Sequence, residues 1–140
     1  MSRHARIVFL CTGNSCRSIM AEYLLEELSK GKWKARSAGS RPTGQPHPLA
    51  LQVLSEIGID ASAATSQHID VYADRPYDLV VTVCDRAKES CPVLPGAQRL
   101  EHWPFPDPAD ATGSEEEQLV VFRDVRDQIR QRLLDFLDTA

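Results

Sequence analysis

Residues 7–25 read IVFLCTGNSCRSIMAEYLL, and this stretch decides the fold that we expect. The apolar run 7–10 is typical of a short buried strand, and the apolar residues of 19–28 recur at helical spacing. A glycine-containing loop, 11–18, joins the two. In a strand–loop–helix unit, the loop N–H groups and the helix N-terminus converge on one spot and favour negative charge there. The sequence therefore predicts a site for an anion.

Two residues of this loop carry the predicted chemistry. Cys11 stands at the end of the strand, where a thiol ionises more easily to the nucleophilic thiolate. Arg17 offers a planar guanidinium fork that suits a tetrahedral oxyanion. The plainer alternative is a buried cysteine and a surface arginine, but the spacing, the glycine and the strand–helix context argue against it.

Three more side chains fit the same picture. The Ser18 hydroxyl can donate a hydrogen bond to the thiolate, and Asn14 can occupy a left-handed position or brace the loop through its amide. Asp107 stands on a proline-stiffened loop, from which it could protonate a leaving oxygen as general acid. Ordinary loop capping explains Ser18 and Asn14 equally well, and a turn residue before proline explains Asp107. Cys16 is interpreted as a small packed residue.

The rest of the chain alternates strands with helices. Further strands are expected at Trp33–Ser37, Tyr77–Val83 and Gln98–His102, a helix over Leu49–Ile57, and a last helix after the capping box of Ser114 and Glu117. The apolar stripe predicted for that last helix is Val121, Val125, Ile129, Leu133 and Phe136. This alternation predicts one α/β domain over 1–140: a small, doubly wound, parallel four-stranded sheet with helices on both faces.

A second cysteine pair follows another strand. Ligands of such sheets bind beyond the C-terminal ends of the strands, so we expect Cys11 and Cys84 at the same edge. Cys84 and Cys91 flank the polar segment DRAKES, which suits an exposed, weakly packed element. They are either incidental thiols or a redox relay. Four cysteines could bind zinc on count alone, but the loop around Cys11 suits an anion, so we predict no metal site.

Composition excludes several classes of protein. The net charge of −4 argues against nucleic acid or an anionic membrane as partner. No apolar run approaches the ~20 residues that span a bilayer, and the start of the chain leads into only about five apolar residues, too few for a secretory signal. We therefore expect a cytoplasmic protein, in which four cysteines do not form a structural disulfide framework.

Three motifs together resemble a known family. The loop CTGNSCRS of 11–18 and the Asp-Pro pair at 107–108 are similar to those of the low-molecular-weight protein tyrosine phosphatases. One branch on that fold, the thioredoxin-coupled arsenate reductases, is more similar still. It shares the pattern VVTxCx6CP, found here at 80–92, and the pattern EHWxFxDPA, found here at 101–109. The pattern GxEEE follows from Gly113. The similarity covers nearly the whole chain, from Ile7 to about Leu134.

The resemblance implies reduction of arsenate to arsenite, an arsenic detoxification that needs no cofactor. Cys11 would attack the arsenic, Asp107 would help water leave, and Cys84 would attack the adduct. Cys91 would then take over the disulfide, which thioredoxin, or glutaredoxin with a low-molecular-weight thiol, would reduce. The oxyanion would be held by Thr12, Gly13, Asn14, Ser15, Cys16, Arg17 and Ser18. We expect a monomer.

A cation site of some relatives is altered in this chain. Those relatives bind potassium through an Asn, a Glu, a Ser and an Asp, of which Asn14, Glu22 and Ser37 match the first three. The fourth position is Gln67, and a neutral amide is a poorer cation ligand than a carboxylate. We therefore predict weak or absent potassium binding.

Two other functions compete with arsenate reduction. The site of Cys11, Arg17 and Asp107 could hydrolyse a phosphomonoester such as phosphotyrosine, with the second cysteine pair protecting against oxidation. Alternatively, the protein could be a non-catalytic thiol sensor or oxyanion-binding module. Replacing Cys84 by Ser separates the first two, because only reduction needs that thiol.

Overall fold

Four parallel strands form the centre of the protein. The computed structural model describes residues 5–72, 76–84 and 98–139. The strands are β1 (Ala5–Cys11), β2 (Trp33–Gly39), β3 (Leu79–Thr82) and β4 (Leu100–His102), in the order β2-β1-β3-β4. All the pairings are parallel. The predicted parallel four-stranded sheet and its α/β class are confirmed.

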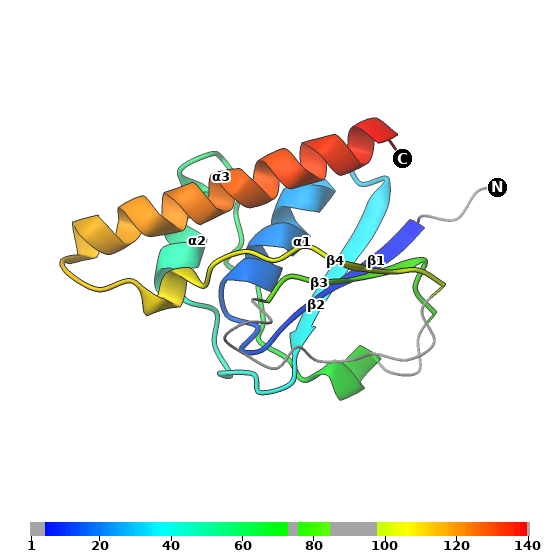
Figure 1. Cartoon of the computed structure of the whole chain (residues 1–140), viewed down its shortest axis with the longest axis horizontal. Coiled ribbons are helices and arrows are strands. Elements are labelled where there is room, and N and C mark those ends of the chain that lie inside the picture. Colours follow the sequence, from blue (N-terminus) through cyan, green and yellow to red (C-terminus); the bar gives the residue numbers. More distant parts are fainter. Residues whose placement is uncertain (1–4, 73–75, 85–97, 140) are drawn as a thin grey trace.

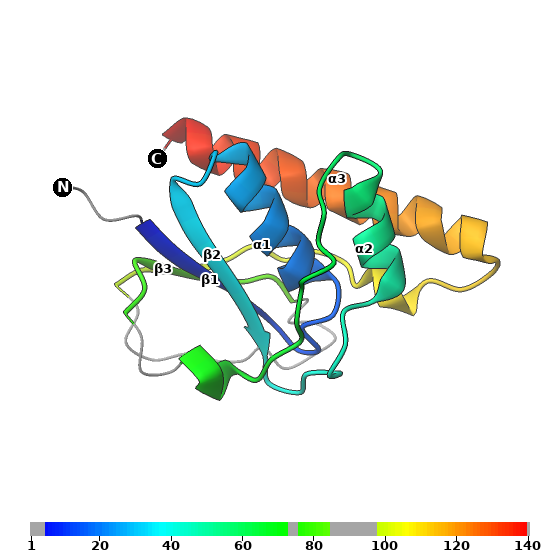
Figure 2. The ribbon, with the colours of Figure 1, turned by 180° about the vertical axis from the view of Figure 1, so that it is seen from behind.

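The α-helices of the described residues gather on one face of this sheet. They are α1 (Arg17–Leu28), α2 (Pro48–Ser55) and α3 (Glu115–Thr139), and α3 packs along both of the others. Figures 1 and 2 show this layer from its two sides. The opposite face carries the 3₁₀ helix η1 (Ile69–Tyr72), visible below the sheet in Figure 1.

The alternation of side chains along β1 supplies both cores. Ile7, Phe9 and Cys11 belong to the large core under the helices, whereas Val8 and Leu10 face the smaller core with Tyr72. Successive side chains of a strand point to opposite faces, so a strand covered on both sides reads as an unbroken apolar run. Strand β1 has a neighbouring strand on each side and therefore lies inside the sheet. Cys11 is the last residue of β1, so it lies at the edge formed by the C-terminal ends of the strands.

The last helix begins as predicted but buries a different stripe near its start. Glu117 N–H donates to Ser114 Oγ, and Ser114 N–H donates to Glu117 Oε1, so the capping box is present. Val121 is 37% exposed, and Leu119 and Phe122 are buried instead. The predicted stripe advanced four residues at a time, which drifts around a helix of 3.6 residues per turn. Over two turns that drift carries Val121 off the buried face.

Helix α2 also ends earlier than expected. It stops at Ser55 rather than Ile57, and Ile57 is 41% exposed. Gly58 has φ of +84°, a left-handed conformation that turns the chain away from the helix axis. In the described part of the chain, none of the helices has the length and apolar character needed to cross a membrane.

Candidate functional site

The loop after β1 turns its carbonyl groups outward. The carbonyls of Thr12, Gly13 and Ser15 accept hydrogen bonds from the N–H groups of Arg41, Thr43 and His47 at 2.9–3.0 Å. In a planar trans peptide the C=O and the next N–H point in opposite directions. The N–H groups of residues 13, 14 and 16 therefore point inward. Together with the N-terminus of α1, they have the arrangement that an anion cradle requires.

Asn14 holds the loop in shape from within. It is fully buried, with φ of 45°, the left-handed conformation predicted for it. Its Oδ1 accepts from the N–H of Gln67 at 2.7 Å, and its Nδ2 donates to Ser18 Oγ at 2.8 Å. Asn14 thus takes both predicted roles, a left-handed residue and a brace.

The Cys11 sulfur lies at the focus of the cradle. It accepts from the N–H of Asn14 at 3.3 Å and lies 2.9 Å from Ser18 Oγ. Because the Asn14 amide already donates to Ser18 Oγ, the Ser18 hydroxyl hydrogen is available for the sulfur. Cys11 is only 2% exposed. Two hydrogen-bond donors thus surround a nearly buried sulfur.

Arg17 and Asp107 lie at the same site, although 90 positions separate them. Arg17 is the first residue of α1, and its Nη1 donates to the carbonyl of Phe105 at 3.2 Å. Its Nη2 lies 3.5 Å from Asp107 Oδ2. Asp107 also accepts from the N–H of Ala109 and caps the 3₁₀ helix η2 (Pro108–Asp110). Asp107 is therefore the turn residue of the plainer interpretation and a neighbour of Arg17 as well.

Cys16 lies in the loop but differs chemically from Cys11. Its Sγ is 3.4 Å from Ser15 Oγ and 3.9 Å from Asp107 Oδ1. Burial raises the pKa of its thiol to about 12, so it stays protonated at neutral pH. This agrees with the prediction of a packed residue.

Cys84 lies just beyond the strand that neighbours β1. Cys84 follows β3 and is fully buried, and the N–H of Val83 donates to the carbonyl of Leu10 at 2.9 Å. The two cysteines thus follow neighbouring strands at one edge, as expected. Cys84 is disulfide-bonded, whereas Cys11 and Cys16 carry free thiols. Cys91 and the predicted polar segment 85–90 lie outside the described residues.

The family follows from a match along almost the whole chain. Residues 6–140 match the model of the low molecular weight phosphotyrosine protein phosphatases. The chain belongs to this family. Among its relatives in the family is the arsenate reductase of Bacillus subtilis, which is 47% identical over 134 residues that cover 96% of each chain.

Solved structures of this family agree. An arsenate reductase in its phosphate-binding state has a TM-score of 0.80 and 32% identity, covering 96% of this chain and 98% of its own. The thioredoxin-dependent arsenate reductase of Corynebacterium glutamicum has a TM-score of 0.71 and 27% identity, covering 99% of this chain and 62% of its own. These matches confirm the resemblance predicted from the sequence: the chain is an enzyme of this family and has arsenate reductases as relatives.

The residues that hold the loop from outside were not predicted from the sequence. Besides the N–H groups of 41–47, Ser66 Oγ donates to the carbonyl of Gly13 at 3.2 Å. Gly39, which ends β2, allows the closest approach: a Cβ there would lie 2.4 Å from the carbonyl oxygen of Thr12. A glycine closing a strand beside the loop was the only signal in the sequence for these contacts.

The side chains that match the potassium ligands in sequence have other partners in this structure. Ser37 Oγ donates to Glu22 Oε1 at 2.6 Å, and burial raises the pKa of the Glu22 carboxyl to about 7. Gln67 directs its side-chain amide to Thr65 Oγ1 at 2.6 Å. A carboxyl that resists ionisation and an amide bound elsewhere fit a potassium ion poorly. Weak or absent potassium binding stays our prediction.

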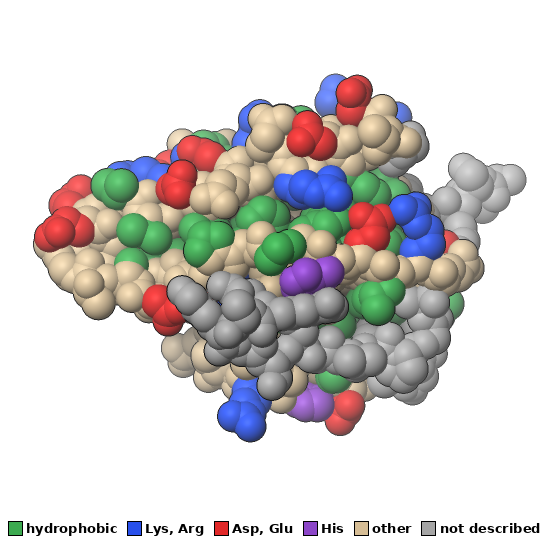
Figure 3. All heavy atoms as spheres, viewed as in Figure 1, with side chains coloured by type: hydrophobic (Ala, Val, Ile, Leu, Met, Phe, Trp, Pro, Cys, Tyr) green, Lys and Arg blue, Asp and Glu red, His purple; other side chains and the backbone are tan. Residues whose placement is uncertain are grey.

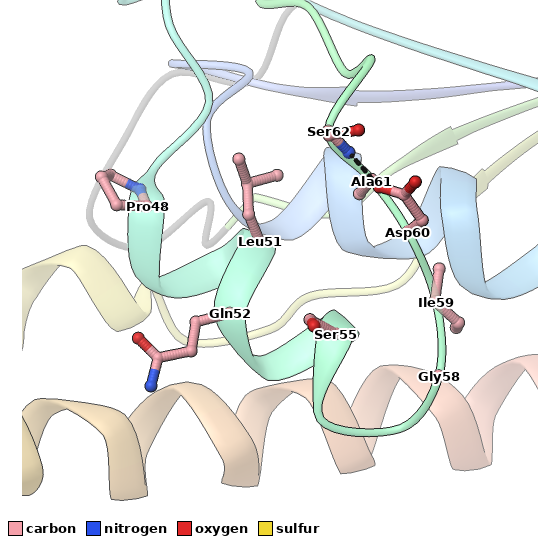
Figure 4. A pocket seen from close by; sticks show the side chains of 9 residues that line it. All are labelled: Pro48, Leu51, Gln52, Ser55, Gly58, Ile59, Asp60, Ala61 and Ser62. Atoms are coloured by element: carbon pink, nitrogen blue, oxygen red, sulfur yellow. Dashed lines mark hydrogen bonds between the residues drawn. The ribbon is translucent and has the colours of Figure 1, made fainter.

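A cavity elsewhere on the protein lacks a thiol nucleophile and a basic side chain that could bind an anion. It measures about 540 Å³ and lies between α2 and residues 58–62 (Figure 4). Its charged lining residue is Asp60, and its lining holds neither a cysteine nor a basic side chain. Among the described residues, no three His, Cys, Asp or Glu side chains converge on a point that could hold a metal ion.

Proposed function

We propose that this protein reduces arsenate to arsenite, with Cys11 as nucleophile, in the cytoplasm. The observation that carries the proposal is the Cys11 sulfur, held by Asn14 and Ser18 at the focus of inward-pointing N–H groups. Such a cradle suits a tetrahedral oxyanion, and the name of the Bacillus subtilis relative identifies arsenate as the candidate. The protein would act as a monomer.

In the first step, the Cys11 thiolate attacks the arsenic of the bound arsenate. The N–H groups of the loop and the Arg17 guanidinium hold its oxygens. One arsenate oxygen leaves as water, and Asp107, 3.5 Å from Arg17, donates a proton to it. The product is an adduct with a bond between Cys11 Sγ and arsenic(V).

In the second step, electrons move from sulfur to arsenic. Once its disulfide has been reduced, the Cys84 thiolate attacks Cys11 Sγ and forms a new disulfide, while the electron pair of the sulfur–arsenic bond stays on the arsenic. Arsenic(V) becomes arsenic(III) and leaves as arsenite. The adjacent positions of Cys11 and Cys84 at one sheet edge support this step.

A third cysteine is needed because Cys84 is fully buried. An external protein thiol cannot reach a buried sulfur, so Cys91 would attack Cys84, release the Cys11 thiolate and leave a Cys84–Cys91 disulfide. Thioredoxin would reduce that bond and become oxidised itself. A relay that depends on thioredoxin belongs in a reducing compartment, which supports the cytoplasm.

The test is a turnover assay with arsenate, thioredoxin, thioredoxin reductase and NADPH. Wild type should consume NADPH only when arsenate is present, and Cys91→Ser should stop after about one turnover. Replacing thioredoxin by glutaredoxin and glutathione identifies the reductant. An absence of arsenate-dependent consumption by wild type would refute the proposal.

Phosphomonoester hydrolysis is the second candidate. It is favoured by Arg17 and Asp107, which complete a site around Cys11 without help from the second cysteine pair. Cys84→Ser should abolish arsenate reduction and leave hydrolysis of p-nitrophenyl phosphate intact. If both activities are present, the protein is a reductase with a phosphatase side activity.

A further inference from the structure

Asp107 lies at the end of a stiff strap. Residues 103–108 read WPFPDP, with a proline at every second position. Each proline fixes its own φ and restricts the residue before it, so all six residues have little freedom. Asp107 is extended, with φ of −81° and ψ of 109°. Because such a strap cannot absorb a displacement by bending, the position of Trp103 at its start determines where Asp107 lies at its end.

Trp103 is held on several sides. Its Nε1–H donates to Glu101 Oε1 at 2.9 Å, and the guanidinium of Arg132 lies 4.3 Å from the centre of its ring. Its ring also packs against Phe136 and Phe9, with centroids 5.5 and 6.1 Å away. We call Glu101, Trp103 and Arg132 the anchor cluster.

The anchor cluster joins two elements that are far apart in the sequence. Arg132 comes from the C-terminal third of α3, whereas Glu101 belongs to β4. The Glu101 carboxylate pairs with Arg99 at 2.6 Å and with Arg132 at 3.7 Å. Figure 3 shows basic and acidic side chains gathered on this face, over the region of β4 and the C-terminal half of α3. The cation over the ring and the carboxylate at the indole N–H fix the ring in two directions.

The strap then runs from the anchor cluster to the site. The N–H of Trp103 donates to the carbonyl of Thr82 at 2.8 Å, and the N–H of Phe105 donates to the carbonyl of Val83 at 3.3 Å. The Phe105 carbonyl accepts from Arg17, and Asp107 lies beside the same guanidinium. The strap thus follows the end of β3 up to the predicted acid.

We infer that Arg132 and Glu101 are positioning residues for the general acid: by fixing Trp103, they set where the Asp107 carboxylate lies. This inference rests on the proposed role of Asp107. Neither Arg132 nor Glu101 lies within contact of Cys11 among the interactions that the structure records for them. Their effect on the reaction therefore passes through the strap.

The test is a double-mutant cycle of Arg132→Met and Asp107→Asn. The rate measured is arsenite formation by the reduced protein in a single turnover without thioredoxin. In the wild-type background, Arg132→Met should slow this rate by about fivefold, since small misplacements of a catalytic group reduce the rate strongly. In the Asp107→Asn background it should have no effect, because the acid that it positions is gone. Equal slowing in both backgrounds, or none in wild type, would overturn the inference.

Arg130→Met is the matched control. Arg130 lies on the same helix, is exposed and carries the same charge, and it has no recorded contact with the anchor cluster among the described residues. Its substitution should change the rate less than twofold. Arg132→Lys, which keeps a cation for the ring, should restore most of the lost rate. If Arg130→Met also slows arsenite formation, or if Arg132→Lys is as slow as Arg132→Met, the loss of rate comes from charge or folding. Either result would count against the inference.

Two further readouts separate this inference from the function on which it rests. Arg17 is held by α1 as well as by the strap, so inhibition by inorganic phosphate should be unchanged in Arg132→Met while the maximal rate falls. A weakened phosphate inhibition would point to a general loss of the site and overturn the inference. If Asp107→Asn alone does not slow the reaction, the proposed acid role fails before Arg132 is tested.

Discussion

Replacing Gly39 by alanine should distort the loop 11–18 directly. The new Cβ would lie 2.4 Å from the carbonyl oxygen of Thr12, 2.9 Å from that of Cys11 and 3.0 Å from the nitrogen of Asn14. All three are backbone atoms of the loop, so a side-chain rotation cannot relieve the overlap. The end of β2 is also fixed, because Gly39 pairs with Cys11 and its N–H donates to the carbonyl of Gln67 at 2.9 Å.

The size of the effect follows from that overlap. A carbon and a carbonyl oxygen approach comfortably to about 3.3 Å, so the loop carbonyl must retreat by about 0.9 Å. Overpacking of this kind typically costs about 1–3 kcal/mol of stability. A displacement of about 1 Å in groups that hold the substrate costs about 100-fold in rate. Gly39→Ala should therefore lose far more activity than stability.

Three measurements check this prediction: urea unfolding, phosphate binding by calorimetry and arsenate-dependent NADPH oxidation. Gly13→Ala is the control for stability, because a Cβ there would meet Thr43 and Ser15 at ordinary contact distances of 3.5 and 3.6 Å. It should unfold at nearly the same urea concentration as wild type. A Gly39→Ala protein with wild-type phosphate binding and turnover would refute the reasoning.

Three other predictions concern titratable and capping groups. Burial raises the pKa of Cys16 to about 12, so iodoacetamide at pH 8 should leave this thiol unmodified. Peptide mass spectrometry measures the modification, and rapid modification of Cys16 would contradict its burial. The pKa of Glu22 rises from 4.5 to about 7 on folding, so its ionisation opposes folding and stability should fall as pH rises from about 4.5 through 7. In potassium-free buffer, the free energy of unfolding of Glu22→Gln should exceed that of wild type by up to about 3 kcal/mol at pH 8 and by much less at pH 5. A stability difference that does not change with pH would show that the ionisation of Glu22 is not its cause. Ser114→Ala should lose about 1 kcal/mol in urea unfolding, because Ser114 Oγ accepts from the N–H of Glu117, whereas an unchanged midpoint would mean that the cap contributes nothing.

Local patterns predicted the parts of this protein that depend on near neighbours in the sequence. The strand–loop–helix unit is continuous in the sequence, and the left-handed Asn14 and the contact between Ser18 and Cys11 both lie within its loop, 11–18. The capping box spans four. In these cases the residue type determines the local hydrogen bond, so the sequence is sufficient to predict the local structure.

Contacts between distant segments were harder to predict. The support from residues 41–47 uses backbone N–H groups, which every residue except proline has, so no side chain announces it. The buried stripe of α3 depends on which side of the helix meets α1 and α2, and there Val121 was misplaced. The approach of Asp107 to Arg17 was foreseen only as a possibility of the proline-rich loop.

The outward carbonyls of the loop 11–18 have a consequence for how this protein tolerates mutation. The donors at positions 41, 43 and 47 are backbone amides, and nearly any amino acid can supply one. A library covering these positions should therefore retain many different side chains and reject proline, which has no N–H. Comparison of sequences would then rank this segment as unimportant, although the shape of the loop 11–18 depends on it.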